Sequence, residues 1–131
     1  MHSQKASLVA PIGLIVLLLG GCGGKTMCKI NSINVFPAAA TANHNALPPG
    51  NMQQFAAFIA SEPSGCAFMQ SNLTNATWSV SDTTNISIGN APGTNGMATC
   101  NGATAGAATV TATVPAGDGT NVSNTASLTC N

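Results

Sequence analysis

Apolar residues alternate with hydroxyl-bearing residues along much of this chain, and this alternation limits the folds open to it. Trp78, the only tryptophan, and Val80 alternate with threonine and serine over residues 77–81. Residues 108–114 alternate alanine and valine with three threonines. Successive side chains of a β-strand point to opposite faces, so a two-residue period indicates a strand with one buried face. We expect the other strands to pack around the stretch 75–82.

Seven runs of this kind follow one another, with turn-forming residues between them and no helical period. They lie at residues 32–36, 54–59, 77–81, 86–88, 96–100, 108–114 and 125–130. Short strands at spacings of about ten residues are typical of an all-β sandwich. The core is expected to contain larger apolar side chains of these runs, namely Phe55, Trp78, Val80, Val110 and Leu128. The segment 66–74 shows no clear pattern.

The N-terminal residues have the features of an export signal. Lys5 and the α-amino group precede an uncharged stretch, residues 6–21, whose centre is a run of aliphatic side chains at 14–19. A bilayer span needs about 20 apolar residues, so this stretch is too short and matches the apolar region of a cleaved signal peptide.

Residues 19–22, Leu-Gly-Gly-Cys, resemble the lipobox of bacterial lipoproteins. The resemblance implies a diacylglycerol on the Cys22 thiol, cleavage before Cys22 and a further acyl chain such as palmitate. Two or more acyl chains hold a protein stably on a membrane. The chain then divides into a signal peptide (1–21), a lipidated N-terminus with a tether (22–27) and one folded domain (28–131). The alternatives are an ordinary secretory signal with Cys22 incidental, or an uncleaved anchor.

Five segments of the remaining chain resemble, in their order, the bacterial immunoglobulin-like domain of the second group, the module repeated in intimin- and invasin-like adhesins. They are SINVFP at 32–37, Gly50 with QQFAA at 53–57, TWSVSD at 77–82, GMAT at 96–99 and GAATVTA at 106–112. The resemblance implies an immunoglobulin-like Greek-key β-sandwich of about seven short strands. It also implies a role as spacer or binding module, without catalytic residues. The chain departs from the family in having one copy, a longer segment around 66–73 and four cysteines.

Those four cysteines, Cys28, Cys66, Cys100 and Cys130, follow the lipobox in an exported chain. An even number in a small exported domain indicates two disulfides. In a seven-strand Greek-key sandwich, the start of strand one and the second-to-third connection share a pole, and the ends of strands five and seven share the other. This favours Cys28–Cys66 with Cys100–Cys130; the main alternative is Cys66–Cys100 with Cys28–Cys130. Their spacings do not fit a structural zinc site, so no metal is expected.

Charged residues make up only 5% of the chain, and arginine is absent. A nucleic-acid partner needs clustered basic residues, so that class is excluded. Beyond the signal, the acids Glu62, Asp82 and Asp118 and the imidazole of His44 are the candidates for acid–base chemistry, and nothing in their spacing brings them together. We expect His44 to be a solvated turn residue and Asp82 to cap the turn that follows it. No enzyme activity, cofactor or small-molecule substrate is expected.

These features predict a lipid-anchored, non-catalytic structural or protein-interaction module of the cell envelope. Residue 23 is glycine, and the lack of an aspartate there favours the outer membrane if the source has one. The expected partners are the membrane, through the lipid, and an envelope protein or glycan. Contact with a protein is expected at exposed threonine-rich edges, such as that formed by Thr109, Thr111 and Thr113.

The alternative function is an adhesive or carbohydrate-binding module at the cell surface. It requires an aromatic side chain on the surface, and the candidates are Trp78, Phe36, Phe58 and Phe68. Because Trp78 shares a strand face with Val80, we expect it to be buried in the core and unavailable to a ligand.

Overall fold

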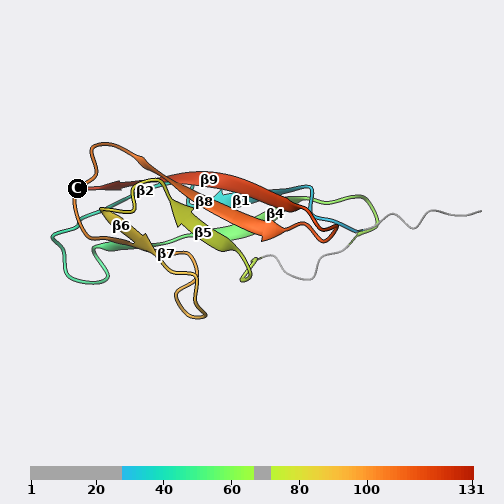
Figure 1. The fold of residues 1–131 in the computed structure, drawn as a ribbon, viewed down its shortest axis with the longest axis horizontal. Helices are drawn as coiled ribbons and strands as arrows, with labels where there is room; N and C mark the ends of the chain where they lie inside the picture. The colour runs from blue at the N-terminus through green and yellow to red at the C-terminus, as the bar shows by residue number, and fades with distance from the viewer. Residues whose placement is uncertain (1–27, 67–71) are drawn as a thin grey trace, which may run out of the picture.

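The computed structural model describes residues 28–66 and 72–131 (Figure 1). The regular secondary structure in these two ranges consists of β-strands alone. None of the described residues belongs to a helix that could cross a membrane. The nine strands are β1 (Ser32–Phe36), β2 (Ala39–Ala42), β3 (Met52–Gln54), β4 (Ala56–Ser61), β5 (Thr77–Val80), β6 (Ile86–Ile88), β7 (Met97–Cys100), β8 (Ala108–Pro115) and β9 (Asn121–Cys130). The predicted signal peptide (1–21) and the lipid-attachment residue Cys22 lie outside the described residues.

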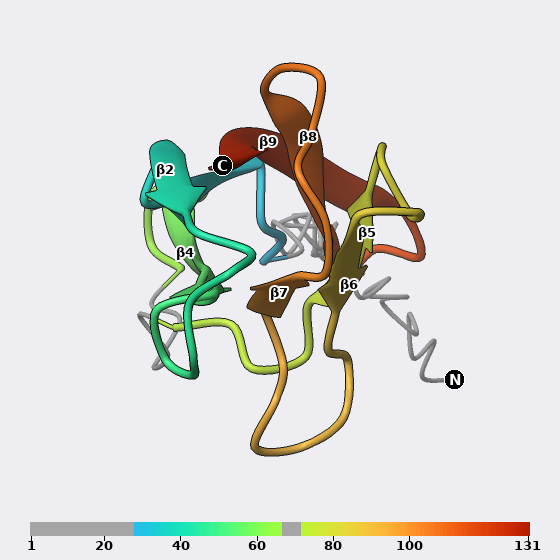
Figure 2. The same cartoon turned by 90° about the vertical axis from the view of Figure 1, so that its left-hand side faces the viewer.

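The strands form two layers, seen along the long axis in Figure 2. One layer is a four-stranded sheet in the order β2-β9-β8-β5, in which β2 runs parallel to β9 and the other pairs are antiparallel. The other layer contains two antiparallel pieces, β1-β4 and β3-β7-β6. Only Phe55 separates β3 from β4, and its N–H donates to the Gly96 carbonyl at 2.8 Å. The two pieces therefore continue one another across a short interruption.

The first strand is divided between the two layers. β1 pairs with β4, the chain bends at Pro37, and β2 pairs with β9 in the other layer. Proline has no N–H for a strand ladder, which suits this bend. If β1 is counted with β2, and β3 with β4, the nine strands correspond to the seven predicted. Their order is that of an immunoglobulin-like Greek-key sandwich, so the predicted fold class is confirmed.

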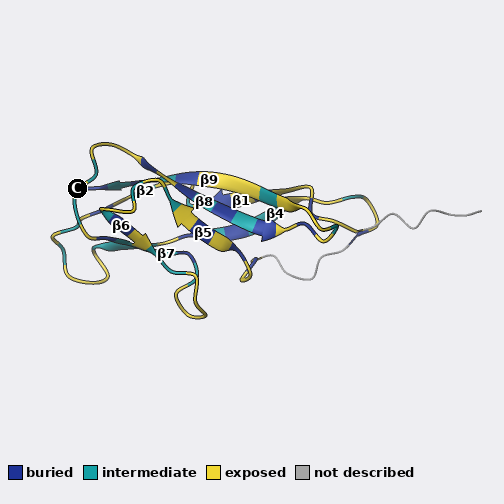
Figure 3. Cartoon of the chain, in the orientation of Figure 1, coloured by how far each residue is buried: buried dark blue, intermediate teal, exposed yellow. Residues whose placement is uncertain are grey.

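The core lies between the layers and follows the two-residue period. Along β8, buried alanine and valine residues alternate with threonines that face outward (Figure 3). Of the predicted core residues, Phe55, Trp78, Val110 and Leu128 are at most 3% exposed. Val80 is only partly buried and packs against the core from its margin.

One strand takes a position that the sequence does not indicate, and the expectation of an exposed threonine-rich edge is wrong. Among the described strands, β5, which carries Trp78, pairs with β8 alone and so forms the edge of its sheet. β8 lies between β9 and β5, so Thr109, Thr111 and Thr113 occupy the outer face of a central strand and offer no free edge. The alternation of residues marks which face of a strand is buried, and it carries no information about the strand's neighbours.

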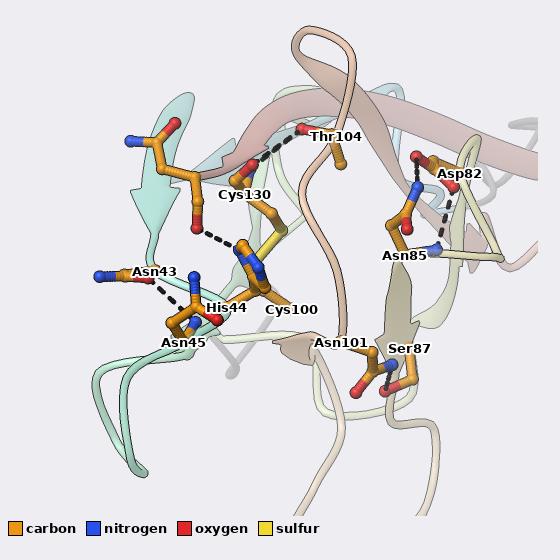
Figure 4. Close-up of a disulfide and its surroundings, with 11 residues drawn as sticks. Asn43, His44, Asn45, Asp82, Asn85, Ser87, Cys100, Asn101, Thr104 and Cys130 are labelled. Atoms are coloured by element: carbon orange, nitrogen blue, oxygen red, sulfur yellow. Dashed lines mark hydrogen bonds between the residues drawn. A yellow bond between two sulfur atoms is a disulfide. The ribbon is translucent and has the colours of Figure 1, made fainter.

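A disulfide lies at each end of the sandwich. Cys28–Cys66 joins the beginning of the described domain to the segment after β4, with Cα atoms 5.4 Å apart. Cys100–Cys130 joins the ends of β7 and β9, with Cα atoms 5.7 Å apart (Figure 4). These are the pairings that the shared-pole argument favoured.

Candidate functional site

The acidic side chains of two loops are engaged in local turn structure. Asp118, in the β8–β9 loop, accepts hydrogen bonds from the Thr120 hydroxyl and from the Thr120 N–H at 3.0 Å, and pairs with Lys29 Nζ at 3.2 Å. These bonds, that of the Thr120 side chain above all, lower the pKa of Asp118 to about 2. Asp82 accepts hydrogen bonds from Asn85 Nδ2 at 2.9 Å and Asn85 N at 3.1 Å, and these lower its pKa. The capping role expected for Asp82 is confirmed.

The groups considered for acid–base chemistry do not all lie at one pole of the sandwich. Asp82 and Asp118 follow the C-terminal ends of the antiparallel neighbours β5 and β8, so they lie at opposite poles. His44, in the turn after β2, bonds through its backbone N–H and Nδ1 to the Asn131 carbonyl. In Figure 4 the segment from Asn101 to Thr104 passes between His44 and Asp82. Among residues 28–66 and 72–131, no three His, Cys, Asp or Glu side chains gather as metal ligands.

Trp78 is held by two asparagines of the β6–β7 loop. Its backbone N–H donates to Asn90 Oδ1 at 2.6 Å, and Asn90 Nδ2 donates to the Trp78 carbonyl at 3.0 Å. The indole Nε1 donates to Asn95 Oδ1 at 2.9 Å, while Asn95 Nδ2 donates to the Ala76 carbonyl at 2.8 Å. The ring is buried and its polar groups have partners, so Trp78 offers no surface to a ligand.

A cleft of about 550 Å³ lies beside this tryptophan, between β4 and the β6–β7 loop. Gln54 lines the cleft, and its Nε2 donates to the carbonyls of Phe55 at 2.6 Å and Asn95 at 2.8 Å. Asn90 and Asn95 also line it, and both bond to the β5 segment. These three amides are used within the protein and hold the loop against the edge of β5. Asn72 also lines the cleft, is exposed and forms no side-chain hydrogen bond in the described residues.

A second hollow, of about 540 Å³, lies where the outer faces of β1 and β4 meet β9. Phe36 is 68% exposed there, and Phe58 is half-buried. The β1–β4 register places Asn34 opposite Phe58 and Phe36 opposite Ala56, so both phenyl rings lie on the same outer face. We call this hollow the Phe36 groove. Phe68, the remaining phenylalanine considered as a surface aromatic, lies outside the described residues.

No protein-family model matches this sequence, and no curated protein matches it. The fold therefore stands on the strand order alone. The resemblance to bacterial immunoglobulin-like domains of the second group, the lipobox and the function inferred from them stay predictions.

Reasoning from sequence missed the asparagines that bond to strand edges. Asn90, Asn95 and Asn124 lie outside the seven alternating runs, and the sequence predicts no role for them. Nothing in their spacing marks them, because their partners on β5 and β1 are distant in sequence, as in the bond from Asn124 Nδ2 to the Ile33 carbonyl at 2.7 Å.

Proposed function

We propose that this chain is a lipid-anchored protein of the cell envelope whose immunoglobulin-like domain is a non-catalytic structural or protein-interaction module. The observation that carries the proposal is the position of Cys28. Only residues 23–27 separate it from the lipobox cysteine Cys22. Since an extended residue spans at most about 3.6 Å, a lipid on Cys22 holds the domain within about 20 Å of the bilayer surface.

The disulfide Cys28–Cys66 determines which end of the domain is attached to the tether. It fixes Cys28 to the pole that also carries the β8–β9 loop. That pole then faces the membrane, and the pole with Cys100–Cys130 points away from it. Two disulfides also fit an exported protein, because oxidising compartments preserve them.

The charge of the domain supports attachment by lipid alone. One lysine and three acidic residues lie in residues 28–131, so the domain is not attracted to an anionic bilayer surface. The outer face of the β2-β9-β8-β5 sheet is neutral and carries the hydroxyls of paired residues, among them Thr111 opposite Ser79 and Thr125. The acidic residues Asp82 and Asp118 serve turns, which supports a non-catalytic role.

Metabolic labelling with a palmitate analogue tests the proposal. We expect the wild-type chain to carry the label and to sediment with membranes, at the outer membrane if the source has one. The variant Cys22→Ser should lose both properties and appear in the soluble exported fraction. Label retained in Cys22→Ser would refute the anchor. Capture of envelope proteins by the anchored wild type, with Cys22→Ser as control, then tests the interaction role.

One observation favours the alternative function, an adhesive or carbohydrate-binding module. That alternative required an aromatic side chain on the surface, and Phe36 is exposed beside Phe58. Trp78 is buried, so the aromatic candidate is Phe36.

A further inference from the structure

The Phe36 groove combines an aromatic surface with unengaged polar groups. Asn34 and Thr125 line it together with Phe36 and Phe58. Neither the Asn34 amide nor the Thr125 hydroxyl forms a hydrogen bond within the part of the chain that the structure describes. In contrast to the amides of Gln54, Asn90 and Asn95 beside Trp78, these groups are available to a ligand.

Asn124 shapes the groove from the β9 side. Its Nδ2 donates to the Ile33 carbonyl at 2.7 Å, and its Oδ1 accepts the Thr125 N–H at 2.7 Å. The amide thus joins β9 to the outer edge of β1 and occupies a backbone acceptor there. A peptide that adds to β1 as a further strand would need that acceptor, so strand addition is disfavoured.

None of the described residues that line the groove is charged. Ionic ligands such as nucleic acids and acidic peptides are recognised by paired charges, which are lacking here. The face of a phenyl ring carries negative charge density. It attracts the C–H groups on the apolar face of a sugar ring, while amide and hydroxyl groups bond sugar hydroxyls.

We propose that the Phe36 groove binds an uncharged polysaccharide chain, with a sugar ring stacked on Phe36 and hydroxyls bonded by Asn34 and Thr125. The proposal deepens the carbohydrate-binding alternative and rests on the proposed non-catalytic binding role, and it is independent of the lipid anchor. The sugar-binding surface is then the outer face of β1 and β4, between the two poles of the sandwich.

The test uses the full exported chain, in phosphatidylcholine vesicles if it carries lipid and in buffer if it does not, with fluorescein-labelled xylan, galactomannan, hydroxyethylcellulose and dextran as probes. Labelled polygalacturonate is the acidic control. We expect saturable binding of at least one neutral probe and weaker binding of polygalacturonate. Phe36→Ala should weaken that binding about tenfold, because the sugar ring loses the aromatic surface on which it lies. Asn34→Ala should weaken it severalfold.

Leu47→Ala is the matched control, because Leu47 is the other large apolar side chain exposed in the described residues, at 86%. It should bind as the wild type does, which separates a site from general adsorption. Phe36→Ala should retain the wild-type melting temperature, since its ring is mostly exposed. Failure of all four neutral probes, equal binding by Phe36→Ala, or preference for polygalacturonate would each overturn the proposal. Palmitate labelling of the same preparations reports the anchor separately.

Discussion

The side chain of Asn90 takes the place of a neighbouring strand for Trp78. Its Oδ1 accepts the Trp78 N–H at 2.6 Å and its Nδ2 donates to the Trp78 carbonyl at 3.0 Å. β5 is an edge strand, and exposed edges are open to pairing with other chains unless something blocks them. Proteins often use charged residues for this, and this chain has very few. Here the amide of Asn90 bonds to the edge of β5, and the amide of Asn124 bonds to the edge of β1. These amides block the two edges in place of charged residues.

Replacing Asn90 should therefore weaken the domain and open the edge of β5. In Asn90→Ala the N–H and carbonyl of Trp78 lose their partner, which costs about 1–3 kcal/mol. We expect a lower midpoint in urea and concentration-dependent association by size-exclusion chromatography. Asn75→Ala is the control, because Asn75 is exposed and its side chain makes no hydrogen bond in the described chain. Equal stability of the two variants would contradict the strand-like role of Asn90.

The indole of Trp78 contributes both packing and a hydrogen bond. Trp78→Ala should lower the free energy of unfolding by about 3–5 kcal/mol, through the cavity it leaves beside Phe55. Trp78→Phe keeps most of the ring but leaves Asn95 Oδ1 without its donor, at a cost of about 1–3 kcal/mol. Urea unfolding followed by circular dichroism measures both. A phenylalanine variant as stable as the wild type would show that the Asn95 bond adds nothing.

Gly96 is required for the close approach of β7 to Phe55. Its φ is +77°, and a Cβ there would overlap the Phe55 carbonyl oxygen and lie 3.1 Å from Trp78 Cε2. Gly93 has a similar φ of +87° with no atom within 4 Å of such a Cβ. Gly93→Ala should lower the free energy of unfolding by about 1–2 kcal/mol, because the left-handed backbone conformation is unfavourable for alanine. Gly96→Ala should lower the free energy of unfolding by clearly more, as measured by thermal unfolding. An equal loss of stability in the two variants would refute the steric argument.

Each disulfide should stabilise the domain by about 2–4 kcal/mol. Cys100 and Cys130 are both 1% exposed, so that pair is best replaced by alanine to avoid burying a hydroxyl. Unfolding in urea of Cys28→Ala/Cys66→Ala and Cys100→Ala/Cys130→Ala, with dithiothreitol-treated wild type as reference, measures each contribution. Non-reducing peptide mass spectrometry should find the pairs Cys28–Cys66 and Cys100–Cys130; four free thiols would contradict the structure.

The Asp118 carboxylate should make stability pH-dependent only in acid. Its folded pKa, about 2, lies below the ordinary value of 3.8, so the ionised form favours the folded state. That contribution is fully present above about pH 4 and is lost as the pH falls toward 2. Carbon-detected NMR titration of the carboxyl group should report the low pKa. Thr120→Val should raise it more than Lys29→Ala, because the Thr120 hydroxyl bond is its largest cause; the reverse order would contradict this assignment.

The strand positions were largely readable from the sequence, and their lengths and subdivisions were not. β2 and β3 were missed because their few small or polar residues show no alternation, and pairing with β9 and β7 makes them strands. β9 begins at Asn121, ahead of the predicted 125, because it continues to pair with β8 as far as Pro115. Tertiary pairing extends strands past the local pattern.

The sequence indicated one of the structural sites, the cysteine pairs, and did not indicate the other, the Phe36 groove. The alternation of strand direction, which fixes the poles of a Greek-key sandwich, favoured the observed cysteine pairing over its main alternative. The Phe36 groove did not follow, because its walls come from β1, β4 and β9 and depend on the chain changing layers at Pro37. Phe36 was identified as an aromatic candidate, and only its exposure at 68% distinguishes it from Trp78.

The sequence by itself determined the all-β class and the buried face of each main strand, because these depend on the two-residue period of the pleat. It favoured the observed pairing of the cysteines through the alternation of strand direction. Only the tertiary structure decided that β5 is an edge, that β8 is central and that Asn90 and Asn124 bond to open strand edges. These features arise from contacts between segments far apart in the chain, and a local period carries no record of which strands become neighbours.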